Sequence, residues 1–139
     1  MTLKVLNTSE FDPYYQRYLD KLPMDIPLWE SFHLGKSQVM EFFKAIPEAK
    51  HDFRYAPEKW TPKEVLQHLI DTERIFQYRC FRIARHDKTE LAGFDQNIFI
   101  EPSMASNKTI EAIVSEFIAV RDSSLSLLHS LSEMDLAQI

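Results

Sequence analysis

The histidines are the first candidates for chemistry in this sequence, because imidazole binds metals and exchanges protons near neutral pH. No two of them lie three or four residues apart, the spacing that puts two rings on one face of a helix. A complete histidine metal site therefore cannot be predicted from spacing. His33 and His129 fall off the expected apolar faces and are predicted to lie on the surface. The five histidines are His33, His51, His68, His86 and His129.

His68 has the most suggestive neighbours of the five. Glu64, His68 and Asp71 follow an i, i+4, i+7 pattern, so in a helix they share one strip. A polar strip beside an apolar face is where a helical bundle builds a site between facing helices. In the alternative interpretation, Glu64 caps the helix, Asp71 is solvated and His68 is a half-buried histidine without a ligand. Spacing alone favours the alternative.

Arg121 is the second unusual residue, because it falls within an apolar stripe between Phe117 and Leu128. A guanidinium there needs a carboxylate partner or must extend to solvent. It could bind an anion or orient a carboxylate of a site, but a structural ion pair with Glu73 is the interpretation we favour. Cys80 is predicted to be a buried small apolar residue and not a nucleophile.

The element that carries His68 has the clearest helix start in the chain. Thr61-Pro62-Lys63-Glu64 is a capping box with proline at the first helical position. We expect the helix to continue to about Arg85. Its core stripe is predicted to be Val65, Leu69, Phe76, Cys80 and Ile83.

Two further long helices are predicted, over residues 27–46 with Asp25 as N-cap and over residues 109–131. A short helix is expected after Asp12-Pro13, a long connection over residues 86–107, and the start of another connection from Ser132. Each long helix has a wide apolar face, which four helices bury more fully than three. The prediction is an all-α, up-and-down helical bundle that forms one domain over residues 1–139. It is one helix short of the four-helix type, with the fourth helix missing; a three-helix bundle is the alternative.

Composition narrows the function classes. The 139 residues include only two glycines, which disfavours all-β and Rossmann-type folds, and a net charge of −5 disfavours nucleic-acid binding. One cysteine excludes an internal disulfide, and no signal peptide or membrane span is apparent, so a cytoplasmic location is expected. An open groove lined by apolar helix faces predicts a homodimer.

Residues 60–76 closely resemble the second-helix signature of the DinB-like superfamily, whose core is W-[ST]-x-K-E-x-x-x-H-x-x-D. The resemblance extends over nearly the whole chain. It also includes Tyr14-Tyr15, Tyr78-Arg79, residues 82–85, residues 93–96, and Glu116-Phe117 with Arg121.

The resemblance implies an up-down-down-up four-helix bundle with one long crossover. It also implies a divalent metal, zinc or nickel, held by three histidines. His68 corresponds to the ligand on the second helix, and the other two belong to an H-x-x-x-H pair on the last helix. This sequence ends at Ile139, before that pair. Characterised relatives include thiol S-transferases that use bacillithiol or mycothiol, and predicted metal-dependent hydrolases.

Two function hypotheses follow. In the first, the protein is a metal-dependent hydrolase or thiol S-transferase acting on a small molecule, such as a low-molecular-weight thiol. His68 would be a metal ligand, Asp71 an auxiliary group, and Arg79 or Arg121 an anion contact. In the second, the chain is a catalytically inactive bundle with an incomplete metal site, which binds a small molecule or a partner helix or dimerises.

Overall fold

The computed structural model describes residues 6–136, and every regular element within that range is a helix. Three helices are long: α2 (Leu28–Lys44), α3 (Pro62–Ala84) and α5 (Ile110–His129). The short α-helices are α1 (Gln16–Leu19), α4 (Asn97–Ile100) and α6 (Glu133–Leu136). Three 3₁₀ turns complete the described chain: η2 (Pro13–Tyr15), η3 (Glu48–Lys50) and η4 (Ala105–Asn107).

The predicted helices are confirmed, with ends that differ by one or two residues. Thr61 caps α3 and Thr109 caps α5 through their side chains, which explains why these starts were readable from sequence. The predicted N-cap at Asp25 is wrong, because Pro27 occupies that position and its carbonyl accepts from the N–H of Ser31 at 3.0 Å.

The expected connection after Ser132 is also wrong, because residues 133–136 form α6. The N–H of Ser132 donates to Oδ2 of Asp135 at 2.8 Å, and the N–H of Asp135 donates to Oγ of Ser132 at 3.2 Å. These two bonds make a capping box that begins a helix.

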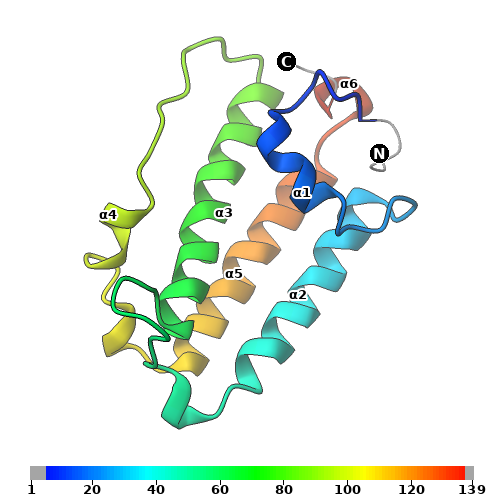
Figure 1. Cartoon of the computed structure of the whole chain (residues 1–139). Helices are drawn as coiled ribbons and strands as arrows, with labels where there is room; N and C mark the ends of the chain where they lie inside the picture. The colour runs from blue at the N-terminus through cyan, green and yellow to red at the C-terminus, as the bar shows by residue number, and fades with distance from the viewer. Residues whose placement is uncertain (1–5, 137–139) are drawn as a thin grey trace.

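Helix α5 lies between α2 and α3 and packs against both (Figure 1). The fully buried core comes from α3 and α5, which contribute Leu66 and Ile70 on one side and Ile113 and Phe117 on the other. Phe43 adds the contribution of α2. The described residues thus form an all-α bundle around three long helices, as expected from the sequence.

The predicted core stripe of α3 is wrong. Leu66 and Ile70 are 0% exposed, whereas Val65, Leu69 and Phe76 are 36%, 37% and 47% exposed. Helix α3 has two apolar strips, and α5 covers the one that contains Leu66 and Ile70. No long helix within residues 6–136 covers the other strip, which the sequence pattern could not reveal. No helix in this range is long and apolar enough to span a bilayer.

Candidate functional site

The capping box at the start of α3 places His68 two turns into the helix. The N–H of Glu64 donates to Oγ1 of Thr61 at 3.2 Å, and the N–H of Thr61 donates to Oε2 of Glu64 at 2.8 Å. Arg54 donates from Nη2 to Oε1 of Glu64 at 2.6 Å. Both oxygens of Glu64 are therefore used at the helix start, which confirms its capping role.

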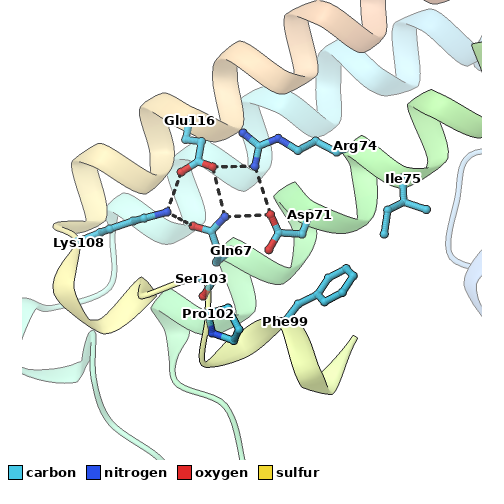
Figure 2. Close-up of a pocket in the computed structure, with 9 residues that line it drawn as sticks. All are labelled: Gln67, Asp71, Arg74, Ile75, Phe99, Pro102, Ser103, Lys108 and Glu116. Atoms are coloured by element: carbon cyan, nitrogen blue, oxygen red, sulfur yellow. Dashed lines mark hydrogen bonds and ion pairs between the residues drawn. The ribbon is translucent and has the colours of Figure 1, made fainter. Parts of the chain in front are cut away.

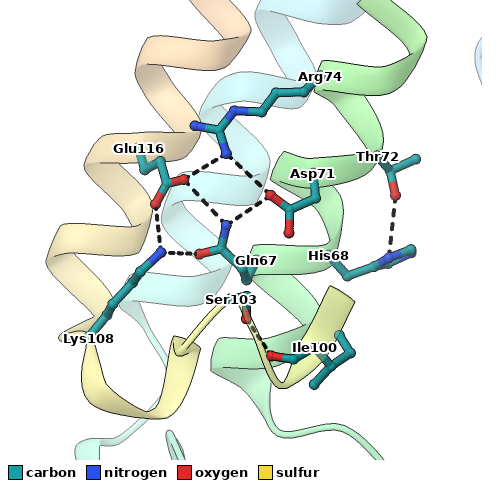
Figure 3. Close-up of polar contacts among 9 residues, drawn as sticks. All are labelled: Gln67, His68, Asp71, Thr72, Arg74, Ile100, Ser103, Lys108 and Glu116. Atoms are coloured by element: carbon teal, nitrogen blue, oxygen red, sulfur yellow. Dashed lines mark hydrogen bonds and ion pairs between the residues drawn. The ribbon is translucent and has the colours of Figure 1, made fainter. Parts of the chain in front are cut away.

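His68 is half-buried and held by two neighbours. The centroid of its ring lies 4.8 Å from that of the Trp60 ring. Figure 3 shows the second contact, in which Nδ1 of His68 lies 3.3 Å from Oγ1 of Thr72. Burial lowers the pKa of His68 below that of a free histidine, and the negative charge of Asp71 only partly opposes this shift. The imidazole is therefore uncharged at neutral pH.

Asp71 also belongs to a polar network of five side chains, which come from α3, from α5 and from the loop that precedes α5 (Figure 2). Gln67 donates from Nε2 to Asp71 at 3.2 Å and to Glu116 at 3.3 Å. Arg74 donates from Nη1 to the same two carboxylates, at 3.2 Å and 2.8 Å. Lys108 donates from Nζ to Gln67 at 2.8 Å and to Glu116 at 3.1 Å. We call Gln67, Asp71, Arg74, Lys108 and Glu116 the polar network.

The polar network keeps Glu116 ionised. Burial by itself would raise the pKa of Glu116, but hydrogen bonds from Arg74, Lys108 and Gln67 outweigh burial and lower it. The network borders a surface depression of about 460 Å³. The rest of its lining is Ile75, Phe99, Pro102 and Ser103.

Asp71 connects the polar network to His68. Its Oδ1 accepts both hydrogen bonds from Gln67 and Arg74, and its Oδ2 accepts none from the residues that the structure describes. Figure 3 shows the Asp71 carboxylate between the network and the His68 ring. The predicted strip from Glu64 through His68 to Asp71 therefore brings together only the last two as accessible groups.

Arg79 lies further along α3 and ties down the long connection. Its Nη2 donates to the carbonyl of Ala92 at 2.8 Å, and its guanidinium lies about 5.5 Å from the rings of Phe76 and Phe94. Arg121 lies on α5 and forms the predicted ion pair with Glu73 of α3. Their roles as anion contacts stay predictions, and neither residue joins the contacts of His68.

A divalent metal requires three or four protein ligands for a tight site. Within residues 6–136, no group of three His, Cys, Asp or Glu side chains could hold a metal ion. His68 and its neighbour Asp71 therefore supply two ligands at most. The residues that the structure describes do not by themselves fit a complete metal centre.

The family model described as the DinB superfamily matches residues 31–139. Comparison with curated proteins gives no match.

Among solved structures, the chain is similar to YfiT from Bacillus subtilis, described as a probable metal-dependent hydrolase with an unusual four-helix bundle topology. The TM-score is 0.65 with 14% sequence identity, and the match covers 85% of this chain and 71% of YfiT. At this identity the likeness establishes the fold.

Proposed function

Because this chain belongs to the DinB superfamily, we propose that it is a metal-dependent enzyme acting on a small molecule, with His68 as one metal ligand. The reaction would be of the hydrolase or thiol S-transferase type. Membership in the family and the described activity of the fold neighbour YfiT support the proposal. Zinc and nickel are the candidate ions, because both accept imidazole ligands.

The state of the His68 ring is the observation that carries this proposal. A metal binds only the neutral imidazole, and burial favours that form here. In the tautomer that carries its proton on Nδ1, His68 donates to Oγ1 of Thr72, which lies 3.3 Å away, and Nε2 then keeps its lone pair for a metal. A second residue that fixes tautomer and ring orientation is typical of histidine ligands. Further ligands would have to come from outside the described residues, for example from a second copy.

The polar network is the proposed substrate contact. Arg74 is half-exposed, and within the described part of the chain only its Nη1 makes hydrogen bonds, which leaves its other nitrogens to donate to a ligand. Oδ2 of Asp71 offers an acceptor beside it. A small polar molecule in the depression would therefore meet a donor from Arg74 and an acceptor from Asp71, with His68 next to that acceptor.

The enzyme proposal is tested by chelation. Purified protein should be assayed for ester hydrolysis and for transfer of a low-molecular-weight thiol, before and after treatment with a chelator. We expect an activity that chelation removes and that zinc or nickel restores. His68→Ala should show no restored activity, whereas His86→Asn, at an exposed histidine outside this region, should behave as wild type. An activity that survives chelation and His68→Ala would contradict the proposal.

A groove nearer the C-terminal end of α5 supports a second candidate function, a dimerisation module. It is a mainly apolar cavity of about 250 Å³ between the three long helices. Phe76 lines it and is 47% exposed, and burial raises the pKa of the Cys80 thiol on its wall, which keeps the thiol protonated. The other apolar lining residues are Leu28, Phe32, Leu127 and Leu128.

The proposed occupant of the groove is a second copy of this chain. Phe76 belongs both to the groove and to the apolar strip of α3 that no long helix covers, and an exposed apolar surface of this kind is typical of interfaces between subunits. Sedimentation velocity should show a dimer that Phe76→Glu converts to a folded monomer. A wild-type monomer at all concentrations would contradict dimerisation. A dimer without metal and without chelator-sensitive activity would favour the module over the enzyme.

A further inference from the structure

Two surface histidines from different helices lie side by side, away from the candidate site. His33 lies in the second turn of α2, and His129 is the last residue of α5. Their ring centroids are 6.0 Å apart and their planes differ by 34°. Both residues are exposed. The sequence predicted a surface position for each but gave no indication that they are neighbours.

The backbones that carry the two rings are fixed relative to each other. One turn along α2 from His33, Lys36 forms an ion pair with Asp122 of α5. Beside that pair, Nη1 of Arg121 donates to the backbone carbonyl of Phe32 at 3.0 Å. These contacts set the register of α2 against α5. The two imidazoles therefore need only side-chain rotation to converge on one point.

We propose that His33 and His129 form a binding site for a divalent transition-metal ion that bridges α2 and α5. A zinc ion about 2.0–2.1 Å from one nitrogen of each ring would place the two ring centroids about 5–6 Å apart. The observed separation of 6.0 Å lies at the upper end of this range. Imidazole pairs favour copper, nickel and zinc over magnesium and calcium.

The electrostatic surroundings agree with a cation at this position. His129 lies in the last turn of α5, where the negative end of the helix dipole favours positive charge. His33 lies beyond the first turn of α2, where the unfavourable positive end has little effect. Within residues 6–136 no third metal-binding side chain joins the pair. The site would therefore be completed by water or a small anion, and its ion would exchange readily.

A bridging ion would hold the first turns of α2 to the end of α5. Because the ion binds only the folded arrangement of the two helices, zinc should stabilise the protein by mass action. At a free zinc concentration roughly 100 times the dissociation constant, we expect the melting temperature to rise by several degrees.

The test uses tag-free protein that carries His68→Ala, so that its outcome is independent of the proposed enzyme site. Zinc binding is measured by equilibrium dialysis and by the shift in melting temperature. In this background we expect one zinc per chain, lost when either His33→Ala or His129→Ala is added. The matched control is His86→Asn, which removes an exposed histidine elsewhere and should leave zinc binding unchanged.

Two results would overturn this site. One is the absence of any zinc binding by the His68→Ala protein at millimolar free zinc. The other is unchanged zinc affinity after both His33→Ala and His129→Ala. Failure of the enzyme proposal would appear differently, as wild-type protein that carries no metal dependent on His68.

Discussion

Arg121 of α5 and Glu73 of α3 form a two-pronged ion pair within the bundle. Nε of Arg121 lies 2.7 Å from Oε1 of Glu73, and Nη2 lies 2.9 Å from Oε2. The side chains are only 15% and 11% exposed. The remaining nitrogen, Nη1, donates to the carbonyl of Phe32, so one arginine joins all three long helices. The structural interpretation of Arg121 is therefore confirmed.

Removing the charge of Glu73 should destabilise the fold. Glu73→Gln leaves the guanidinium of Arg121 largely desolvated and without a countercharge, which costs about 2–4 kcal/mol of unfolding free energy. Urea denaturation measures the change. The matched control is the double variant Glu73→Leu with Arg121→Met, which removes both charges and should recover most of the loss. A loss below about 0.5 kcal/mol for Glu73→Gln would contradict the inferred role.

Replacing Gly35 by alanine should not stabilise the protein, although alanine usually stabilises a helix interior relative to glycine. A Cβ at Gly35 would lie 3.3 Å from Nη1 of Arg121, whose position is fixed by Glu73 and Phe32. Gly35→Ala should therefore not raise the free energy of unfolding of the wild-type protein. In an Arg121→Met background, it should add about 0.5–1 kcal/mol, the usual difference in helix propensity. A double-mutant cycle measures this coupling, and equal effects in both backgrounds would exclude it.

Ser124 of α5 is buried together with its polar hydroxyl group. It is 5% exposed, and among residues 6–136 its Oγ has no hydrogen-bond partner. Ser124→Ala should therefore raise the unfolding free energy by about 0–1 kcal/mol. The control is Ser123→Ala at the preceding residue, which removes the 2.6 Å hydrogen bond that Gln77 donates to Ser123 and should not stabilise the protein. A loss above about 1 kcal/mol for Ser124→Ala would show that its hydroxyl is bonded.

Local signals in the sequence predicted local structure well. Thr61 and Glu64 lie three residues apart, so their capping box and the helix after it could be read directly. The buried face of α3 could not be predicted, because Leu66 and Leu69 are equally apolar and only the position of α5 distinguishes them.

In the candidate site too, features within one helix could be predicted from the sequence, and contacts between helices could not. His68 and Asp71 were identified from spacing within one helix. Gln67, Lys108 and Glu116 were not predicted as site residues, because their contacts join α3 to residues about 40 to 50 positions later in the chain. The pairing of His33 with His129 depends in the same way on how α2 packs against α5.

The protonation of His68 gives a prediction for pH. Its pKa is lower in the folded protein than in the unfolded chain, so the unfolded state binds more protons as pH falls. The neutral His68 ring therefore contributes to the free energy of unfolding. This contribution is fully present above about pH 6.5, the pKa of histidine in an unfolded chain, and it is lost as the pH falls through the lower pKa of the folded protein. Metal-free wild type should thus lose stability relative to His68→Gln across this window.

The same shift can be followed directly by NMR. In metal-free protein, the ring of His68 should titrate with a midpoint below 6.5, the ordinary value for histidine. A midpoint at or above that value would contradict the uncharged imidazole on which metal binding at His68 depends.

The most direct test of the central claim is metal analysis combined with intact mass on one purified, tag-free sample. The chain should have its expected mass of 16.4 kDa and, after exhaustive dialysis, carry close to one zinc or nickel. His68→Ala should remove that metal, whereas His86→Asn should retain it. A chain of this mass without bound metal, or with metal that survives His68→Ala, would contradict the assignment of His68 as a metal ligand.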